Sequence, residues 1–396
     1  MPLAQQPLTQ HYSSIHWLCT NWGCNMGESD GLHGMAVTRR HALAWGAAGA
    51  LTSASLASVL AACGSSSKPS AASQLSGTLI LLGYPGWYGP NEFTEFHHRH
   101  PRLTVRNSAS GLVGDAQHIA QITGNSGKFD LTLCGPPVAR QLQLAGFVQP
   151  LDRSAVPNLK YVAPVFQRQF PYGIPTDYGK TGIAYRKDLI PERPTSWHDL
   201  WQLAKKYSGK TTMLNYDIDI QGSALRYLGY SVNSTNPDEL NKMQQALLEL
   251  KPHLQAVLST DYSKPLIEGT AYMAVDYDYD IAAAQQKNKN IVWVLPEEGA
   301  AAYIEGWAAL QPANHLAAVW ELMNFHLQPR TYASFINYTG AAYVEPAAKP
   351  DLKQYIVMNQ SLRYDAAALR KVEFEKYLGA KGVAERGKLW EEFLAA

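Results

Sequence analysis

Short apolar or alternating runs, each bounded by turn residues, recur along the chain from residue 77 onward. Such runs predict β-strands, because successive side chains of a strand point to opposite faces of a sheet. The predicted strands cover residues 77–84, 102–108, 128–135, 182–186, 271–277, 290–296 and 306–310.

Between these strands lie segments with helical periodicity. Residues 196–209 begin with a capping box of Ser196 and Asp199 and place apolar residues on one face. A second helix is predicted over residues 236–250, with Asn236 as its N-cap. Alternation of strands and helices predicts an α/β protein, in which ligands bind beyond the carboxyl ends of strands.

The N-terminal segment has a different pattern. Residues 1–34 show no clear hydrophobic period, and we interpret them as an over-extended N-terminus. Residues 35–62 combine paired arginines with a small-residue apolar stretch, which predicts a signal peptide. The sequence "LAAC" that ends at Cys63 resembles a bacterial lipobox, so Cys63 is the predicted lipidation site, and residues 63–75 read as a flexible tether.

Two alternatives stay open for this segment. Residues 42–62 could form a retained membrane helix, although their many Ala, Ser and Gly residues make a weak span. Arg39 and Arg40 suit either twin-arginine export or the general pathway.

Net charge, cysteine content and length exclude some classes of function and structure. The net charge is +1 for the whole chain and is unchanged when residues 1–62 are removed, so no global attraction to nucleic acid is expected. Cys134 is the only cysteine after Cys63, so no disulfide is predicted within the mature chain. Residues 63–396 form a longer chain than one that usually folds around a single hydrophobic core, so two lobes are expected.

The sequence gives little support for a catalytic or metal-binding motif. "YGKTG" at 178–182 lacks the glycine that a phosphate loop needs, because Ile174 stands there. "HHRH" at 97–100 could offer metal ligands, but it ends a short helix, where positive side chains suit the carbonyl end. No Gly-x-Ser-x-Gly or His-Glu-x-x-His motif occurs. We therefore predict no cofactor, no metal and no enzyme activity.

Aromatic residues instead recur beside carboxylates or at strand ends. They fall in four segments, "GYPGWYG" (83–89), "NYDID" (215–219), "VDYDYD" (275–280) and "AYIEG" (302–306). Ring faces attract cations and carboxylates accept ammonium hydrogens, so the combination is typical of a site for an alkyl ammonium. We expect no basic residue of the chain to neutralise it.

Each of these residues also has a simpler explanation. Asp280 precedes "IAAAQQK" and could cap that helix. Tyr84 and Tyr303 could be ordinary core aromatics. Asp217 and Asp219 could belong to a solvated loop.

Several segments resemble the substrate-binding proteins of spermidine/putrescine ABC transporters. The similarity is carried by residues 174–186, 194–201, 224–240, 250–255, 266–277, 294–310 and 322–335. The most specific parts are the Gly-x-Thr-Gly-Ile-x-Tyr motif with the following Pro-x-Ser-Trp-x-Asp-Leu, and the Pro-x-Glu-Gly block followed by an aromatic residue and an acid.

The resemblance implies an α/β, two-lobe periplasmic-binding-protein fold of type II, with crossover segments as hinge and the ligand in the interlobe cleft. Lobe 1 would comprise residues 76–180 plus 306–348, and lobe 2 residues 181–305 plus 349–396. The implied ligand-binding residues are an aromatic box, anionic positions and one polar contact: Tyr84, Trp87, Tyr277, Tyr303, Asp219, Asp280, Glu305 and Glu375.

The chain departs from the family pattern in two places. Gly135 and Pro137 stand where the family has a Ser and a Tyr, so those side-chain contacts are lost. Tyrosines replace the common tryptophans at Tyr277 and Tyr303, and a smaller ring changes the width of the slot and adds a hydroxyl.

The expected function is that of a monomeric, exported lipoprotein, anchored through Cys63 to the outer face of the cytoplasmic membrane. It would capture a polyamine and deliver it to the permease of an ABC importer. One alternative keeps the fold and binds another solute, such as an amino-acid derivative, a sugar or thiamine. Another is a secreted enzyme that uses the Asp and Tyr cluster as acid and base.

Overall fold

A computed structural model describes residues 75–108, 115–362 and 365–396. The predicted signal peptide, Cys63 and nearly all of the tether lie outside the described residues. Residues Leu75–Ala396 form one compact unit. Within the described part of this unit, no helix combines the length and the apolar character that crossing a membrane requires.

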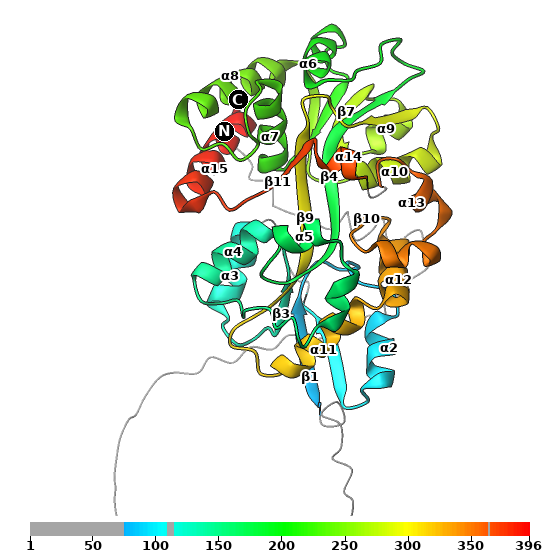
Figure 1. The fold of residues 1–396 in the computed structure, drawn as a ribbon. Helices are drawn as coiled ribbons and strands as arrows, with labels where there is room; N and C mark the ends of the chain where they lie inside the picture. Colours follow the sequence, from blue (N-terminus) through cyan, green and yellow to red (C-terminus); the bar gives the residue numbers. More distant parts are fainter. Residues whose placement is uncertain (1–74, 109–114, 363–364) are drawn as a thin grey trace, which may run out of the picture. The chain divides into compact units, whose positions relative to one another are not determined.

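The described strands form a single sheet, whose main path runs in the order β2-β1-β3-β9-β4-β7-β5-β6 (Figure 1). The strands are β1 (Gly77–Leu82), β2 (Leu103–Asn107), β3 (Leu131–Leu133), β4 (Ile174–Arg186), β5 (Thr211–Leu214), β6 (Leu254–Leu258), β7 (Met273–Tyr277), β8 (Ile291–Val294), β9 (Ala300–Ala309), β10 (Ala342–Tyr343) and β11 (Val372–Phe374).

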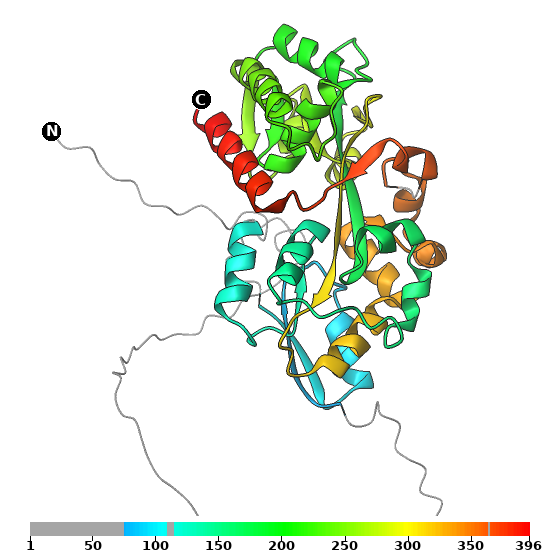
Figure 2. The ribbon, with the colours of Figure 1, turned by 60° about the vertical axis from the view of Figure 1, so that its left-hand side comes forward.

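Helices cover the sheet on both sides (Figures 1 and 2). The α-helices are α2 (Glu92–Arg99), α3 (Asp115–Gly124), α4 (Pro136–Leu144), α5 (Pro164–Gln169), α6 (Trp197–Lys206), α7 (Asp217–Tyr227), α8 (Pro237–Leu250), α9 (Lys264–Glu268), α10 (Asp278–Lys287), α11 (Leu316–His326), α12 (Pro329–Thr339), α13 (Gln354–Met358), α14 (Ala366–Leu369) and α15 (Gly379–Ala395). Short 3-10 helices are η2 (Pro157–Tyr161), η3 (Lys251–His253) and η4 (Pro346–Asp351).

Two long antiparallel strands, β4 and β9, connect the two halves of the sheet (Figure 1). We call the part built on β1, β2 and β3 the β1–β3 half, and the part built on β5, β6, β7 and β8 the β5–β8 half. β9 pairs with β3, whereas the later residues of β4 pair with β7 and β8. Side chains of β4 and β9 therefore lie at the junction between the two halves.

The predicted strands all exist, but β4 and β9 are longer than the predicted 182–186 and 306–310. Every residue of β4 is buried, including the polar residues Asp177 and Lys180. Buried polar residues break the apolar pattern on which the sequence prediction rested. The short strands β5, β6, β10 and β11 were also not predicted.

The predicted helix starts are confirmed. Ser196 accepts a hydrogen bond from the Asp199 backbone N–H and completes the capping box of α6. Asn236 caps α8 through the Asp238 backbone N–H. The apolar faces of α6 and α8 pack into the core, so the capping residues and the buried face of each helix favour the same structure.

Candidate functional site

Tyr277 lies at the centre of a cluster of aromatic rings and carboxylates. It is the last residue of β7 and is 7% exposed. Its hydroxyl donates a hydrogen bond of 2.7 Å to Asp219 Oδ2. Its ring meets Tyr303 edge-on, with centroids 5.3 Å apart, and stacks with Tyr279 at 5.7 Å. Tyr216, at the start of α7, adds another edge contact at 6.1 Å.

Trp87 brings the β1–β3 half to this cluster. It belongs to the loop between β1 and α2, and its ring lies edge-on to Tyr279 at 5.9 Å. Its indole Nε1 donates a hydrogen bond of 3.1 Å to Asp177 Oδ1 in β4. The ring also contacts Phe335 of α12 at 6.4 Å, which fixes it against its own half. Aromatic faces from both halves therefore meet at one place.

Asp177 and Glu305 form one acidic pair of the site. They are register partners in the β4–β9 ladder, so their side chains project from neighbouring positions. Asp177 Oδ2 and Glu305 Oε2 are buried and have no hydrogen-bond partner in the described structure. Burial raises the pKa of Asp177 to about 7. Burial, with the charge of Asp177, raises the pKa of Glu305 well above its usual value.

Asp276 and Asp280 form a second acidic pair, in the β5–β8 half. Burial raises the pKa of Asp276 well above its ordinary value, with the charge of Asp280 as the next contribution. Burial and the charge of Asp278 raise the pKa of Asp280 to about 7. Asp280 is not the cap of α10, because Tyr277 occupies that position and Asp280 lies inside the first turn. The interpretation of Asp280 as the cap of the following helix is therefore wrong.

Asp219 and Glu375 are brought beside these groups by different elements. Asp219 lies in the first turn of α7, is 2% exposed, and also accepts a hydrogen bond from Thr181 Oγ1, so it does not belong to a solvated loop. Burial raises its pKa to about 6. Glu375 follows β11; burial and the charge of Asp219 raise its pKa well above the usual value.

Tyr84 and Tyr303 are half-buried and also pack against the main core, so the core interpretation is partly correct for both. Burial, followed by the charge of Glu305, raises the pKa of Tyr84. The Tyr303 ring lies over Gly179, where an added Cβ would come within 2.4 Å of its ring carbons. Gly179 therefore leaves room for the ring, and this requirement explains a glycine in the "YGKTG" segment.

Lys180 and Arg386 are buried cations of the chain, but in the described structure neither forms an ion pair with the predicted site residues Asp219, Asp280, Glu305 and Glu375. Lys180 Nζ lies 2.6 Å from Asp278 Oδ2, and both side chains are buried. Arg386 of α15 donates hydrogen bonds to Gln221 and to the Val232 carbonyl. Burial lowers the pKa of Arg386 to about 10, while Asp217 and Glu375 act in the opposite direction. Neither residue forms an ion pair with Asp177, Asp276, Asp280 or Glu305 in the described structure.

The histidines of "HHRH" do not gather into a metal site. His97 contacts the Leu103 carbonyl and His100 lies 3.3 Å from Glu321. Among residues 75–108, 115–362 and 365–396, no group of three or more His, Cys, Asp or Glu side chains could hold a metal ion.

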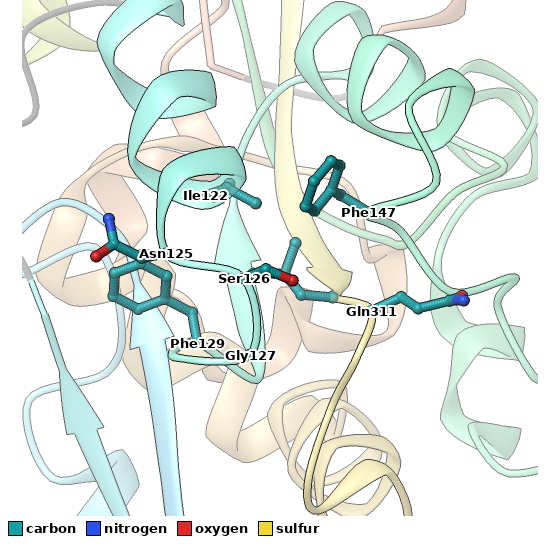
Figure 3. Close-up of a pocket in the computed structure, with 8 residues that line it drawn as sticks. Ile122, Asn125, Ser126, Gly127, Phe129, Phe147 and Gln311 are labelled. Carbon is teal, nitrogen blue, oxygen red and sulfur yellow. The ribbon is translucent and has the colours of Figure 1, made fainter. Parts of the chain in front are cut away.

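Two pockets lie away from this cluster, and none of the predicted binding residues lines either of them. Figure 3 shows the first, which is lined by Ile122, Asn125, Ser126, Gly127, Phe129, Phe147, Leu310 and Gln311. The second has a volume of about 360 Å³ and is lined by Val165, Gln169, Ser231, Asn233, Leu369, Val372, Glu373, Phe374 and Lys376.

Sequence reasoning missed several members of the cluster. Asp177 and Lys180 lie in residues 174–186, which carry the resemblance, and Lys180 also lies in the rejected phosphate-loop segment. Tyr279 lies in "VDYDYD" but is not among the predicted binding residues. Tyr262 was also missed; its ring lies 6.4 Å from Tyr216. The density of tyrosine and aspartate in 276–280 was an available signal for Tyr279. No local signal distinguished Tyr262.

Sequence comparisons identify relatives of this chain among proteins of known name. The chain is 26% identical over 264 residues to the spermidine/putrescine-binding periplasmic protein of Escherichia coli, across 65% of this chain and 75% of that protein. It is 25% identical over 295 residues to a putrescine/cadaverine-binding protein of Pseudomonas aeruginosa, across 70% of this chain and 83% of the relative.

A solved structure supports the fold. The substrate-binding protein of a spermidine/putrescine ABC transporter from Streptococcus pneumoniae superposes with a TM-score of 0.71 at 20% identity, covering 81% of this chain and 99% of that chain. The predicted two-lobe, type II periplasmic-binding fold is thereby confirmed. A family model described as bacterial extracellular solute-binding protein matches residues 91–356. Because this match spans more than half of the sequence, the chain belongs to the family of bacterial extracellular solute-binding proteins.

Proposed function

We propose that this chain is the substrate-binding component of an ABC importer and that it captures a polyamine outside the cytoplasmic membrane. The observation that carries the proposal is the meeting of Trp87, Tyr277 and Tyr303 with buried carboxylates that have no cation partner in the described structure. An unpaired buried anion is costly, and a bound ammonium group removes that cost. Two relatives are named a spermidine/putrescine-binding protein and a putrescine/cadaverine-binding protein, and these names support the same ligand class.

In this proposal each residue type has a separate task. Glu305, with Asp177 beside it, accepts the hydrogens of one ammonium group, and Asp280 accepts those of another. Tyr277 and Tyr303 face the methylene chain, because ring faces offer both apolar contact and cation-π attraction. Tyr84 and Trp87 cover the ligand from the β1–β3 half. Asp219 orients Tyr277 through their hydrogen bond, and Glu375 adds negative potential.

Ligand binding would stabilise the closed arrangement of two lobes. We assign residues 76–180 plus 306–348 to lobe 1 and residues 181–305 plus 349–396 to lobe 2, with β4 and β9 as the crossover segments. Trp87 and Tyr279 come from different lobes in this assignment. A ligand that contacts both rings shifts the equilibrium toward closure, because those contacts exist together only in the closed state.

An exported location fits the periplasmic relatives. We further propose that Cys63 carries a lipid that anchors the chain to the outer face of the membrane, that the chain works as a monomer, and that an ABC permease receives the ligand. No covalent step is required of any residue in this function.

A thermal-shift panel tests the proposal. Putrescine, cadaverine and spermidine are compared with glucose, thiamine and glutamate at equal concentrations and at low and high salt. A ligand present at about 100 times its Kd stabilises the folded state by about 2.7 kcal/mol. We expect stabilisation by the amines alone, reduced by salt because the contacts are charged. Stabilisation by the sugar or thiamine, and none by any amine, contradicts the proposal.

A further inference from the structure

Glu92 and His326 form a buried pair next to the loop that carries Trp87. Glu92 is the first residue of α2 and His326 is the last residue of α11. Their side chains are 1% and 0% exposed, and His326 Nδ1 lies 2.8 Å from Glu92 Oε1. Neither residue is among those that the proposed function assigns to the ligand.

The pair holds the end of the loop between β1 and α2. The Gly89 backbone N–H donates a hydrogen bond of 2.8 Å to Glu92 Oε2, so Glu92 uses one carboxylate oxygen for the loop and the other for His326. A Cβ at Gly89 would come within 3.3 Å of Glu92 Oε2, so the absence of a side chain permits this close approach. Gly89 follows Trp87 by two positions, and the pair therefore fixes the backbone next to that ring.

A second path of contacts joins His326 to Trp87 through side chains. The centroid of the His326 ring lies 5.2 Å from that of Phe335, which in turn lies 6.4 Å from that of Trp87. The His326 ring also packs against Trp307, with centroids 4.4 Å apart. Trp307 and Glu305 are two positions apart in β9, so their side chains project from the same face of the strand. His326 therefore packs on the face of β9 that carries the proposed site.

We propose that Glu92 and His326 are positioning residues, which hold the Trp87 indole in its ligand-covering place before the ligand binds. This inference rests on the proposed function, in which Trp87 covers the ligand. A group that is already ordered loses less conformational entropy on binding, so pre-positioning of the ring raises affinity. Without the pair, the ligand itself would have to order the loop, and the free energy of that ordering would be subtracted from binding.

The test measures putrescine binding by calorimetry at constant pH and ionic strength. His326→Leu removes the donor to Glu92 and should weaken binding by about tenfold. His326→Asn keeps a side-chain N–H near the position of Nδ1 and should bind within about threefold of the wild-type chain. His100→Leu is the matched control, because His100 lies 3.3 Å from Glu321 of α11 at the other end of α2, away from the loop. The control should keep the wild-type affinity.

A double-mutant cycle separates positioning of the ring from a general effect on stability. In the Trp87→Ala background, His326→Leu should change putrescine affinity by less than about twofold, because the ring that it positions is absent. A purely structural role of His326 would give the same loss of affinity in both backgrounds. Circular dichroism and thermal unfolding establish that each variant is folded.

Hydrogen exchange of the Gly89 amide tests the inference without any substitution. In the ligand-free wild-type chain this amide should exchange more than about a hundredfold more slowly than an unstructured amide, because Glu92 already accepts its hydrogen. Exchange at the unstructured rate would show that the pair does not hold the loop.

The outcomes separate the two proposals. Failure of the wild-type chain to bind any amine refutes the proposed function. If the wild-type chain binds putrescine, an unprotected Gly89 amide overturns only the positioning role, and this result does not depend on any variant folding. Equal losses of affinity for His326→Leu with and without Trp87, or binding by His326→Asn that is as weak as that of His326→Leu, overturn it as well.

Discussion

Asp177 and Glu305 occupy opposite positions in the β4–β9 ladder, and each has one buried carboxylate oxygen without a partner in the described structure. Two carboxylates at directly opposed buried positions destabilise a strand pair once both are ionised. The arrangement costs the ligand-free protein stability, and a bound cation relieves it. The same two carboxylates therefore lower the stability of the ligand-free protein and raise its affinity for a cation.

Replacing Glu305 with Gln should separate these two quantities. Loss of a charged hydrogen bond should weaken putrescine binding by about 1.5 to 3 kcal/mol, measured by calorimetry. Loss of the repulsion from Asp177 should raise the melting temperature of the ligand-free protein. The exposed Glu391→Gln serves as control and should change neither quantity. Unchanged putrescine titration in the Glu305 variant would refute its assignment as a ligand residue.

The pH dependence follows from the raised carboxyl pKa values, about 6 for Asp219 and about 7 for Asp177 and Asp280. An unfolded Asp titrates near 3.9, so the folded, ligand-free protein binds more protons than the unfolded chain between about pH 4 and 7. The stability contributed by these groups is fully present below about pH 4 and is lost as the pH rises to about 7.

Binding of an ammonium ligand should show the opposite trend, because it needs the ionised carboxylates. Putrescine affinity should rise from pH 5 to 8, and binding at pH 6 should release protons. Calorimetry in buffers of different ionisation enthalpy measures that release. Affinity that is constant over this range would show that these acids do not contact the ligand.

Tyr277 contributes a hydroxyl and a ring, which two variants can separate. Tyr277→Phe removes the donor to Asp219 and should reduce the free energy of unfolding by about 0.5 to 1.5 kcal/mol. Tyr277→Leu also removes the ring, and should weaken putrescine binding by about 0.5 to 2 kcal/mol more than the Phe variant does. Chemical denaturation and calorimetry give the two values. Equal affinity of both variants would exclude a role for the ring.

Trp87 should control closure of the lobes. Trp87→Phe loses the hydrogen bond to Asp177 but keeps a ring beside Tyr279, whereas Trp87→Ala loses both. We expect putrescine to reduce the radius of gyration of the wild-type chain and of the Phe variant in small-angle scattering. The Ala variant should show a smaller reduction and weaker binding. A full reduction with Ala at this position would contradict a closing role for Trp87.

Ser196 provides a stability change that leaves the site intact. Ser196→Ala removes the hydrogen bond to the Asp199 backbone N–H at the start of α6 and should cost about 1 kcal/mol of unfolding free energy. Putrescine affinity should remain at the wild-type value, since none of the proposed ligand residues lies in α6. Weaker binding in this variant would mean that affinity in this protein follows global stability.

Local sequence patterns predicted much of the fold. The capping box at Ser196 and the cap at Asn236 depend on residues within one turn, so the sequence contains all the partners involved. Alternating apolar runs located β1, β2 and β7 for the same reason, since one buried face suffices to produce the pattern. The length of β4 could not be found in this way, because its Asp177 and Lys180 are polar and buried.

The sequence by itself determined which kinds of side chain the site contains: tyrosines, a tryptophan and carboxylates placed at strand ends and in loops. Only the tertiary structure decided which of these charges remain unpaired. Lys180 neutralises Asp278 although 98 positions separate them, whereas Asp177 faces Glu305 across the β4–β9 ladder. The physical reason is that the interaction between two charges depends on their distance and burial, and strand register sets both.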